Sequence, residues 1–578
     1  MAPASKRIVR RTDASVGALL HPLPLLSSIY AARGVEDVSQ LSRELSGLLP
    51  PARMKGIDVA SQLLAEAIVS GKRLLIVGDF DADGATSCAL AVLALRAMGA
   101  AWVDFLVPNR FEYGYGLTPE IVALAAHYSP DIIVTVDNGI ASIAGVAAAK
   151  ASGMQVIVTD HHLPGDALPD ADAIVNPNQR GCDFPSKALA GVGVIFYVLL
   201  ATRAVLRDTG FFNDRPAPNL AEYLDLVALG TVADVVPLDA NNRLLVHQGL
   251  LRIRAGRCRP GISALLQVAG KSPQRAVASD IGFAIGPRLN AAGRLDDMSI
   301  GIACLLENDL QRALAMAMQL DAFNRDRRAI EASMQREAET ALQGVVNDGQ
   351  MGYSVCLFDE RWHQGVIGIL ASRLKERFHR PTLIFAPADK GEIKGSGRSI
   401  PGFHLRDALD EVATTHPGLL TKFGGHAMAA GLSLEAEKFE VFRDAFERVA
   451  QRLLTEDDLQ ATIHTDGELP LEYLQLDTAW ALREGGPWGQ GFPEPRFDGE
   501  FILVSQRIVG DKHLKCVLSP AQDVSSIVDG IAFNIDPEQW PAPEGVTVRL
   551  AYSLDVNHFR GRDSLQLLIE HIEVVAGT

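Results

Sequence analysis

Three aspartates fall at alternate positions in one short stretch, Lys72–Ser87, with the sequence KRLLIVGDFDADGATS. Asp79, Asp81 and Asp83 directly follow an apolar run that predicts a buried strand. We expect the chain to turn at Asp83-Gly84 and then to enter a helix. Carboxylates this close repel one another unless a cation lies between them. A plain strand-to-helix turn needs only one aspartate, so three of them favour a metal site.

More carboxylates and imidazoles close later apolar segments. Asp137, the pair His161-His162, and Asp234 each lie where an apolar run ends. A two-metal hydrolytic site needs several carboxylates and a few imidazoles, and oxygen-rich ligation favours Mn²⁺ or Mg²⁺ over structural zinc. Two such ions, about 4 Å apart, can hold a phosphate diester, activate a water and stabilise the leaving oxygen. We expect Asp160 to orient the imidazole of His161.

The elements that must position these side chains alternate between strand and helix. We expect strands at 73–77, 102–107, 131–136, 155–158 and 173–175. Helices are expected between them, at 85–98, 119–126 and 142–151. This alternation predicts a mostly parallel sheet with helices on both faces, and ligands bind at the carboxyl ends of such strands. The aspartates and histidines lie at those ends.

The remainder of the chain predicts a second α/β unit and a small β structure. Strands at 354–358 and 381–385 flank a helix at 368–377, and a long charged helix at 309–342 precedes them. We expect the polar stretch 321–328 of that helix to form a solvated face. Frequent turn signals beyond residue 461 predict an antiparallel barrel or sandwich. Its strands are expected at 501–504, 514–518, 530–533, 547–554 and 564–572.

Composition and charge exclude several classes of protein. The 578 residues, 48% of them hydrophobic, are typical of a globular chain with several domains. The six cysteines are widely spaced without a CxxC pair, which disfavours a disulfide framework or a thiolate zinc site. No apolar run predicts a membrane span or a signal peptide, so we expect a cytoplasmic protein. A net charge of −16 argues against unselective DNA coating, but it does not exclude a nucleic-acid enzyme with a local basic groove.

The ordered motifs resemble those of the DHH phosphoesterase superfamily and, within it, the RecJ family of bacterial single-strand-specific 5′→3′ exonucleases. The first set is GDFDADGATS, VPNRFEYGYG, TVDNGI, TDHH and GTVADVVPL. GPRLNAAGRLDD, RWHQGVIGILASRL, KGSGRS and FGGHAMAAG are similar to the linking region and the DHH-associated domain of that family. HLKCVLS and the terminal strand pattern resemble its OB-fold. The resemblance runs from about residue 70 to the end of the chain.

This resemblance implies a metal centre. The expected ligands of Mn²⁺ or Mg²⁺ are Asp79, Asp81, Asp83, Asp137, His161 and Asp234. The expected catalytic set is Asp81, Asp83, Asp137, His161, His162 and Asp234. Many superfamily members have a histidine four residues before the first aspartate of the DxD pair, where this chain has Val77, and Asp79 is expected to take that role. Two ions are expected, although the number bound at rest stays open.

The resemblance also implies a path for the DNA. A tight turn at 395–399 is expected to present Ser396 and Arg398 to a 5′ phosphate. Arg110 is expected to bind a phosphate near the metals, and Tyr113 and Tyr115 either stack on bases or pack their loop onto the core. Arg294 lines the channel or forms an interdomain salt bridge. The other residues expected along the path are Arg288, Asn290, Gly425 and His426, and, on the OB-like tail, His513, Lys515, Phe559, Arg560 and Arg562.

The predicted fold class is α/β, with a parallel-sheet DHH domain, a second α/β DHH-associated domain joined by a long helix, and a C-terminal β-barrel of the OB type. We divide the chain into an N-terminal helical segment that caps the first sheet, a DHH catalytic domain, a helical linker, a substrate-binding DHH-associated domain and an OB-fold domain for single strands. Their bounds are 1–70, 71–270, 271–345, 346–457 and 458–578.

The leading interpretation is a metal-dependent exonuclease that degrades single-stranded DNA from a 5′ end to 5′ mononucleotides, in recombination and repair. The alternative is a DHH phosphodiesterase acting on cyclic dinucleotides or short oligonucleotides, but such substrates need no extended groove or OB-like tail. A non-catalytic DHH-derived module of the replication apparatus is disfavoured because the metal carboxylates are present. The resemblance further implies single-strand-binding protein and a RecQ-type helicase as partners, no membrane association, and a monomer.

Overall fold

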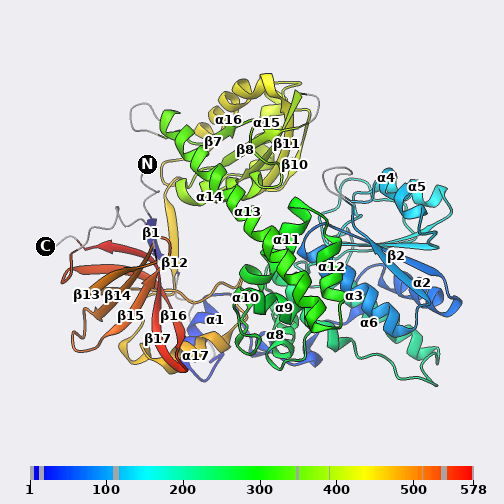
Figure 1. The fold of residues 1–578 in the computed structure, drawn as a ribbon, viewed down its shortest axis with the longest axis horizontal. Coiled ribbons are helices and arrows are strands. Elements are labelled where there is room, and N and C mark those ends of the chain that lie inside the picture. The colour runs from blue at the N-terminus through cyan, green and yellow to red at the C-terminus, as the bar shows by residue number, and fades with distance from the viewer. Residues whose placement is uncertain are drawn as a thin grey trace.

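The structure is a computed structural model that describes residues 6–11, 19–108, 116–345, 351–388, 391–510, 512–535 and 543–575, without the side chains of 343–345. A first unit with a parallel sheet lies at the right of Figure 1, a second unit with its own sheet lies above it, and a barrel lies at the lower left. The long helix α13 (Leu310–Val345) joins the first two units. This arrangement agrees with the predicted fold class.

The sheet of the first unit has the strand order β3-β2-β4-β5-β6, and every ladder is parallel. The strands agree with the predicted ones to within one residue at each end. They are β2 (Arg73–Gly78), β3 (Trp102–Leu106), β4 (Ile132–Val136), β5 (Gln155–Thr159) and β6 (Ala173–Val175). The side chains of β4 are buried throughout, as is typical of a strand covered on both faces.

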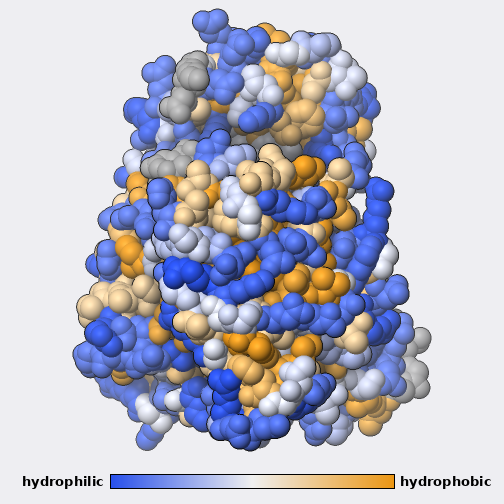
Figure 2. Space-filling view, turned by 90° about the vertical axis from the view of Figure 1, so that its right-hand side faces the viewer, coloured by the Kyte–Doolittle hydropathy of each residue, from blue (hydrophilic) through white to orange (hydrophobic). Residues whose placement is uncertain are grey.

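Alternate residues of β2 point into two separate cores. Leu74 and Ile76 pack with the helices on one face of the sheet, whereas Leu75 and Val77 pack with the helices on the other. The first face is covered by α2 (Ile57–Ser70), α3 (Ala82–Met98) and α6 (Gly191–Asp208). The second is covered by α4 (Pro119–Ala126) and α5 (Ile143–Ala151). Figure 2 faces the right-hand side of the molecule as drawn in Figure 1, and hydrophilic residues separate the apolar patches on that surface.

Further helices complete the first unit and share the core that contains α2, α3 and α6. They are α7 (Leu224–Ala233), α8 (Ala240–Arg254), α9 (Pro260–Val268), α10 (Ala278–Asp280), the π-helical turn η6 (Ile281–Ile285), α11 (Gly286–Leu295) and α12 (Ser299–Leu306). The same core continues into the barrel. Within the described residues, no helix has both the length and the apolar character needed to cross a membrane.

Helix α13 changes its buried side chains along its length. Ala313, Ala317 and Leu320 belong to the core of the first unit, and Met334 and Ala338 belong to a core of the second. Between them the buried residues are polar, so the prediction of a solvated face at 321–328 is partly wrong.

The polar section of α13 is buried because its groups satisfy one another. Arg327 donates to Asn324 at 3.1 Å and to Glu331 at 3.0 Å, and Arg373 donates to Glu331 at 2.9 Å. Glu331 thus connects α13 to α14 (Ile367–Phe378) of the second unit. A hydrogen-bonded set of this kind removes the penalty that isolated buried charges would carry.

The second unit contains a mixed sheet in the order β10-β11-β9-β8-β7. Only β7 and β8 are parallel among its pairs. The strands are β7 (Val355–Phe358), β8 (Thr382–Pro387), β9 (Glu392–Arg398), β10 (Lys422–Gly425) and β11 (Ala429–Glu435). Helix α14 packs on one face of this sheet, and α15 (Leu405–Thr415) and α16 (Phe439–Leu453) pack on the other.

The prediction of a tight turn at 395–399 is wrong. Gly395, Ser396, Gly397 and Arg398 lie within β9, which pairs with β8 on one side and β11 on the other. The two glycines are explained by packing, because a Cβ at Gly395 would lie 2.5 Å from the ring of Phe385 and one at Gly397 would lie 2.7 Å from Leu383. Glycine in a strand marks a close approach here, not a turn.

The C-terminal strands form a closed barrel in the order β13-β14-β15-β17-β16. They are β13 (Phe497–Val509), β14 (His513–Pro520), β15 (Val528–Ala532), β16 (Thr547–Phe559) and β17 (Arg562–Val574). The pair β15–β17 is parallel and the others are antiparallel. Closure removes the free sheet edges that an open five-stranded sheet would leave. The shorter helix α17 (Leu476–Gly485) lies beside the barrel.

The N-terminal segment packs differently from the predicted cap. Among the described elements of this N-terminal segment, α2 is the one that covers the first sheet. Strand β1 (Lys6–Arg10) pairs in parallel with β12 (Ala461–Thr465), and α1 (Pro24–Ala31) places Tyr30 against Trp488 and Phe492. The stretch 41–49, expected to be helical, forms short 3₁₀ turns, η1 (Val38–Leu41) and η2 (Leu45–Gly47), followed by η3 (Pro51–Arg53). Pro50 and Pro51 break the helical pattern there.

Strand β1 is fixed by a buried carboxylate. Arg10 donates to both oxygens of Asp498, at 2.7 and 3.1 Å, and Thr465 donates to it at 2.7 Å. Burial would raise the pKa of Asp498, but the hydrogen bonds from Arg10 and Thr465 outweigh it and lower the pKa. A depressed folded-state pKa contributes stability that is present above the unfolded value of 3.8 and is lost as the pH falls through the folded value.

We therefore expect Arg10→Met to lower the free energy of unfolding by about 1–2 kcal/mol at neutral pH, because Asp498 loses a charged donor. The deficit relative to the wild type should shrink as the pH falls below about 4 and through the depressed folded pKa of Asp498, below which the carboxyl is protonated in both proteins. Urea denaturation at the two pH values measures it, with the exposed Arg7→Met as the matched control. An equal deficit at both pH values would assign the effect to lost packing of the arginine stem.

Candidate metal centre

The acidic turn after β2 begins a helix earlier than predicted. The side chain of Asp81 accepts hydrogen bonds from the backbone N–H groups of Asp83 and Gly84, each at 3.0 Å, and is the N-cap of α3. Asp83-Gly84 is therefore the first turn of the helix, and the predicted chain reversal at this dipeptide is wrong. An aspartate cap satisfies N–H groups that would otherwise lack partners. The alternating aspartates thus lie on a fixed backbone.

Asp83 is held from the opposite side by the N-terminus of α6. The N–H groups of Gly191 and Val192 donate to its two carboxylate oxygens, at 2.6 and 2.9 Å. A Cβ at Gly191 would lie 2.6 Å from the Cβ of Asp137 and 2.7 Å from its Oδ1. Only glycine lets the start of α6 approach both aspartates. The positive end of the helix dipole also stabilises their negative charge.

Asp137 follows β4 in a strained backbone conformation. Its φ of 61° lies in the left-handed region, which side chains other than glycine rarely adopt. The next residue, Asn138, is buried and donates to the carbonyl oxygens of Val77 and Val136, at 3.1 and 2.9 Å. This amide anchors the loop to two strands. Such strain persists where the surrounding structure fixes it, and it concentrates at functional sites.

His161 lies among three of the carboxylates. Its Nε2 is 3.1 Å from Asp137 Oδ1, 3.5 Å from Asp234 Oδ2 and 4.0 Å from Asp83 Oδ2. This nitrogen is buried and, among the described residues, makes no hydrogen bond. One nitrogen and three oxygens that converge in this way fit a divalent cation.

The possible ligand atoms form groups that share members. Atoms of Asp83, His161 and Asp234 lie within 4.8 Å of one another, and the same holds for Asp79, Asp81 and Asp137. A further group joins Asp137 to His161 and His162. Asp137 therefore borders both the histidine side and the Asp79 side of the cluster. A carboxylate in that position suits a bridge between two cations.

Asp160 supports His162, whereas the sequence predicted that it would orient His161. Its Oδ1 lies 2.8 Å from Nδ1 of His162 and accepts from the backbone N–H groups of both histidines, at 2.7 and 3.0 Å. Its Oδ2 accepts from Ile140 at 2.9 Å. Burial raises the pKa of Asp160, but the hydrogen bond with His162 outweighs it and lowers the pKa. Asp160 supports His162 and not the His161 ring because the His161 ring points into the carboxylate cluster, whereas the His162 ring folds back toward Asp160.

Burial and mutual repulsion shift the titration of the cluster. Burial, followed by the charge of Asp81, raises the pKa of Asp83 to about 7. Burial and the neighbouring aspartates also raise the pKa values of Asp137 and Asp234 well above the usual range. Burial and His162 lower the pKa of His161 to about 4, so its imidazole is neutral near neutral pH. Without a cation the cluster retains protons, and a bound cation displaces them.

Helix α11 contacts the backbone of the acidic turn that follows β2. Asn290, predicted on the DNA path, accepts a hydrogen bond from the backbone N–H of Ala82 at 2.8 Å. A Cβ at Gly293 would lie 1.8 Å from the carbonyl oxygen of Phe80. The asparagines Asn176 and Asn178, which our sequence reasoning missed, donate to the backbone carbonyls of the two histidines. Their NPN motif, closely following TDHH, was the available signal.

The predicted DNA-path residues lie in several environments. Arg288 is buried and bonded to Asp321 of α13 at 2.8 Å. Arg294 donates to the carbonyl of Gly365 in the second unit at 3.2 Å, so it contacts both units. The residues Arg110, Tyr113 and Tyr115 lie outside the described residues.

Ser396 and Arg398 lie together on β9. Arg398 Nη1 donates to Ser396 Oγ at 3.2 Å, and both side chains approach Gly368 in the first turn of α14. Burial lowers the pKa of the Arg398 guanidinium. Gly425 ends β10 with a φ of 143°, and His426 follows it in the turn to β11. A half-buried arginine, a hydroxyl and a helix N-terminus form an arrangement that suits a phosphate.

Comparison with known families tests the motif-based resemblance. The DHH family N-terminal domain matches residues 73–231, the DHHA1 domain matches 348–452 and the RecJ OB domain matches 465–571. The "Single-stranded-DNA-specific exonuclease RecJ" of Escherichia coli (strain K12) is 55% identical over 552 residues, covering 95% of this chain and 96% of that protein. This chain belongs to the RecJ family. The predicted resemblance is thereby confirmed.

RecJ family members of more distant bacteria share the fold. The protein of the same name from Thermus thermophilus is 33% identical, over 93% of this chain and 79% of that protein. The crystal structure of RecJ from Thermus thermophilus in complex with Mn²⁺ matches with a TM-score of 0.80 at 30% identity, covering 99% of this chain and 80% of that one. Its complex with Mg²⁺ matches with a TM-score of 0.74 at 28% identity, covering 99% of this chain and 79% of that one.

The small residue at the start of α6 yields a prediction about metal binding. We expect Gly191→Ala to weaken Mn²⁺ affinity by more than about 10-fold, because the methyl group would displace Asp137 from the cluster. Isothermal titration of the metal-free protein measures the affinity. Gly165→Ala is the matched control, since its φ lies outside the left-handed region and the nearest atom to a Cβ there is the carbonyl oxygen of Ala167 at 3.9 Å. Unchanged Mn²⁺ affinity in Gly191→Ala would contradict the role assigned to this close approach.

The raised pKa values predict how stability depends on pH. An acid whose folded pKa is raised stabilises the fold fully below its unfolded pKa, and this contribution is lost as the pH rises through the folded value, about 7 for Asp83. The metal-free protein should therefore become less stable between about pH 6 and about pH 8. Because Mn²⁺ competes with these protons, its stabilising effect should be larger at about pH 8 than at about pH 6.

Thermal melting with chelator and with Mn²⁺ at the two pH values tests this expectation. The exposed Asp170→Asn should leave the pH dependence as it is in the wild type. Asp83→Asn should reduce it, since one of the shifted carboxyls is removed. A gain in melting temperature that does not vary with pH would show that the cluster holds no protons for the metal to displace.

Proposed function

We propose that this chain is a Mn²⁺- or Mg²⁺-dependent exonuclease that hydrolyses single-stranded DNA from its 5′ end and releases 5′ mononucleotides. The observation that carries the proposal is the convergence of Asp137 and His161 with carboxylates from both sides of the cluster. Relatives of this length and identity are named single-stranded-DNA-specific exonucleases. Bound cations would supply the Lewis acidity that activates a water and neutralises the phosphate.

The chain's own residues hold these cations and fix their spacing. We assign Asp79, Asp81, Asp83, Asp137, His161 and Asp234 as ligands, with His162 beside them in the catalytic set. Asp160 fixes the orientation of His162 through Nδ1, and α6 and α11 fix the acidic turn from two sides. The site therefore needs little reorganisation when substrate binds, which is the main requirement for electrostatic stabilisation of charge in a transition state.

In this proposal the second unit recognises the 5′ end of the strand. We propose that Ser396 and Arg398 bind the 5′ phosphate beside the N-terminus of α14, and that Arg294 contributes where the two units meet. The barrel extends the path, with Phe559 64% exposed and Arg560 placed 5.2 Å from its ring centroid. Arg110, Tyr113, Tyr115, Gly425 and His426 keep their predicted roles along the path as part of this proposal. Arg288 and Asn290 instead support the site, through Asp321 and through the backbone of Ala82.

The cellular setting is proposed from the family alone. Degradation of single strands from a 5′ end suits recombination and repair, in the cytoplasm. A single-strand-binding protein and a RecQ-type helicase would supply the unpaired strand. The alternative reaction, hydrolysis of cyclic dinucleotides or short oligonucleotides, requires neither the barrel nor a terminal phosphate site.

We expect the purified protein with Mn²⁺ to release 5′ mononucleotides from 5′-phosphorylated single strands and to leave duplexes intact. Asp137→Asn should lower kcat by more than about 100-fold, because a ligand that borders both ion positions is neutralised. Arg398→Ala should raise KM for 5′-phosphorylated ends more than for 5′-hydroxyl ends, because a charge-assisted contact to the phosphate is lost.

Product analysis of 3′-labelled and 5′-labelled strands reads out polarity, and Asp170→Asn is the matched carboxylate control. Full activity of Asp137→Asn would contradict the assigned centre. Release of nucleotides from the 3′ end would contradict the polarity, and preferential hydrolysis of cyclic dinucleotides would favour the alternative.

A further inference from the structure

An exposed aromatic side chain lies in the short π-helical turn that precedes α11. Phe283 is 80% exposed, although most of the residues around it in η6 are buried. This π-helical turn continues directly into α11, which carries Asn290 beneath the acidic turn. A π-turn inside a helical run is rare and is frequently found at functional sites. Single exposed apolar side chains are common on protein surfaces, so the position of this ring, and not its exposure alone, is what matters.

Val235 is the second unusual residue at this place. It directly follows Asp234, has a φ of 61°, and is 62% exposed. A β-branched residue in the left-handed region is strained, and strain of this kind persists at functional sites. Gly282 packs close to Val232, so that a Cβ there would lie 3.3 Å from its side chain. The segment that carries Phe283 therefore lies against the end of α7, the helix that presents Asp234.

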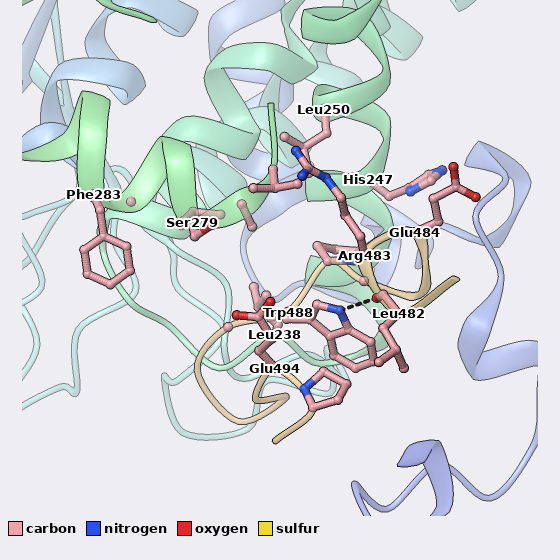
Figure 3. A pocket seen from close by; sticks show the side chains of 18 of the residues that line it. Leu238, His247, Leu250, Ser279, Phe283, Leu482, Arg483, Glu484, Trp488 and Glu494 are labelled. Atoms are coloured by element: carbon pink, nitrogen blue, oxygen red, sulfur yellow. Dashed lines mark hydrogen bonds between the residues drawn. The ribbon is translucent and has the colours of Figure 1, made fainter. Parts of the chain in front are cut away.

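Val235 and Phe283 both line a cavity of about 440 Å³ between the first unit and the barrel. In Figure 3 the ring of Phe283 projects from its helix at one edge, while Trp488 and Glu494 lie across from it on the barrel side. Leu554, Val556 and Leu568 of the barrel strands complete the wall. Sites of this volume take ligands the size of a nucleobase or a small molecule.

The polar groups of this cavity favour a neutral occupant over a phosphate. Arg254 and Arg483 line it, but their guanidinium groups donate to the backbone carbonyls of Ala276 and Arg275, at 2.8 and 2.7 Å. Glu494 and Asp555 line it as well and would repel a phosphate. Carboxyl oxygens instead accept hydrogen bonds from the exocyclic amino groups of bases. Apolar walls with a few such acceptors suit a neutral, planar base.

We propose that Phe283 stacks on an unpaired base of the bound strand and that this cavity between the metal centre and the barrel receives that base. The inference rests on the function proposed above and adds a binding residue to it. Phe283 would hold the strand where it passes from the barrel to Asp234, and it acts on binding without taking part in hydrolysis. Stacking on aromatic side chains tolerates any base, as an exonuclease requires.

The test combines a protein variant with a modified substrate. We expect Phe283→Ala to raise KM for a long single strand by about 5- to 150-fold, the range that a lost base–aromatic stack gives, with kcat little changed. Phe283→Trp should restore KM, and Phe283→Leu should not. Val69→Ala on α2, which is 61% exposed, is the matched control and should behave as the wild type. Melting temperatures verify that each variant is folded.

A set of strands with one abasic nucleotide, moved stepwise from the 5′ end, locates the stacked base. At one position, removal of the base should raise the KM of the wild type by about the same factor as Phe283→Ala does. The KM of Phe283→Ala should not rise further at that position. Abasic penalties that multiply with the variant's penalty at every position would overturn the inference, as would an unchanged KM in Phe283→Ala. Either result leaves the proposed function intact, which fails only if the wild type does not degrade single strands.

Discussion

The mutual repulsion of buried carboxylates is the constraint on which the rest of this structure depends. Asp83, Asp137 and Asp234 lie within a few ångströms of one nitrogen of His161. Asp83 and Asp137 are almost removed from water, and Asp234 is partly exposed. Such a cluster is unstable by itself, as the raised pKa values show. The fold opposes this repulsion with backbone N–H groups: those of Gly191 and Val192 bind Asp83, and those of Asp83 and Gly84 bind Asp81. Neutral donors leave the negative charge available for cations.

The first unit, the second unit and the barrel are joined by two kinds of contact. The first unit and the barrel share one continuous apolar core, whereas the second unit has separate cores. The end of α13 belongs to one of these cores, and its middle section meets α14 through hydrogen-bonded polar groups. The metal centre is thus built on the larger body, and the pair Ser396 and Arg398 belongs to the other. A polar junction is easier to adjust than an apolar core, because its hydrogen bonds can be exchanged with water at little net cost. The geometry of the cluster is independent of such adjustment.

Much of this fold could be predicted from periodicity, because the strands of the first sheet are short apolar runs that end in acidic or imidazole residues. The convergence of the aspartates and His161 could be predicted for the same reason, since parallel strands bring their carboxyl ends to one edge. The misplaced features have a common cause. Gly395 and Gly397 suggested a turn, but in the strand they relieve contacts with Phe385 and Leu383, partners distant in sequence. Asp160 was matched with the wrong histidine because sequence adjacency does not show which ring folds back.

Residues that act only through tertiary contact were beyond sequence reasoning. Gly191 has no motif of its own, and its importance follows from the 2.6 Å that would separate a Cβ from Asp137. Phe283 has the opposite signature, since an aromatic residue in a helical stretch predicts a buried side chain and this one is exposed. Both lie within a few residues of a helix end that contacts the acidic cluster. The chemistry of a metal nuclease can therefore be inferred from its carboxylates. The shape that holds the cations and the strand depends instead on uncharged residues, which act through the absence of a side chain, as at Gly191, or through the position of one, as at Phe283.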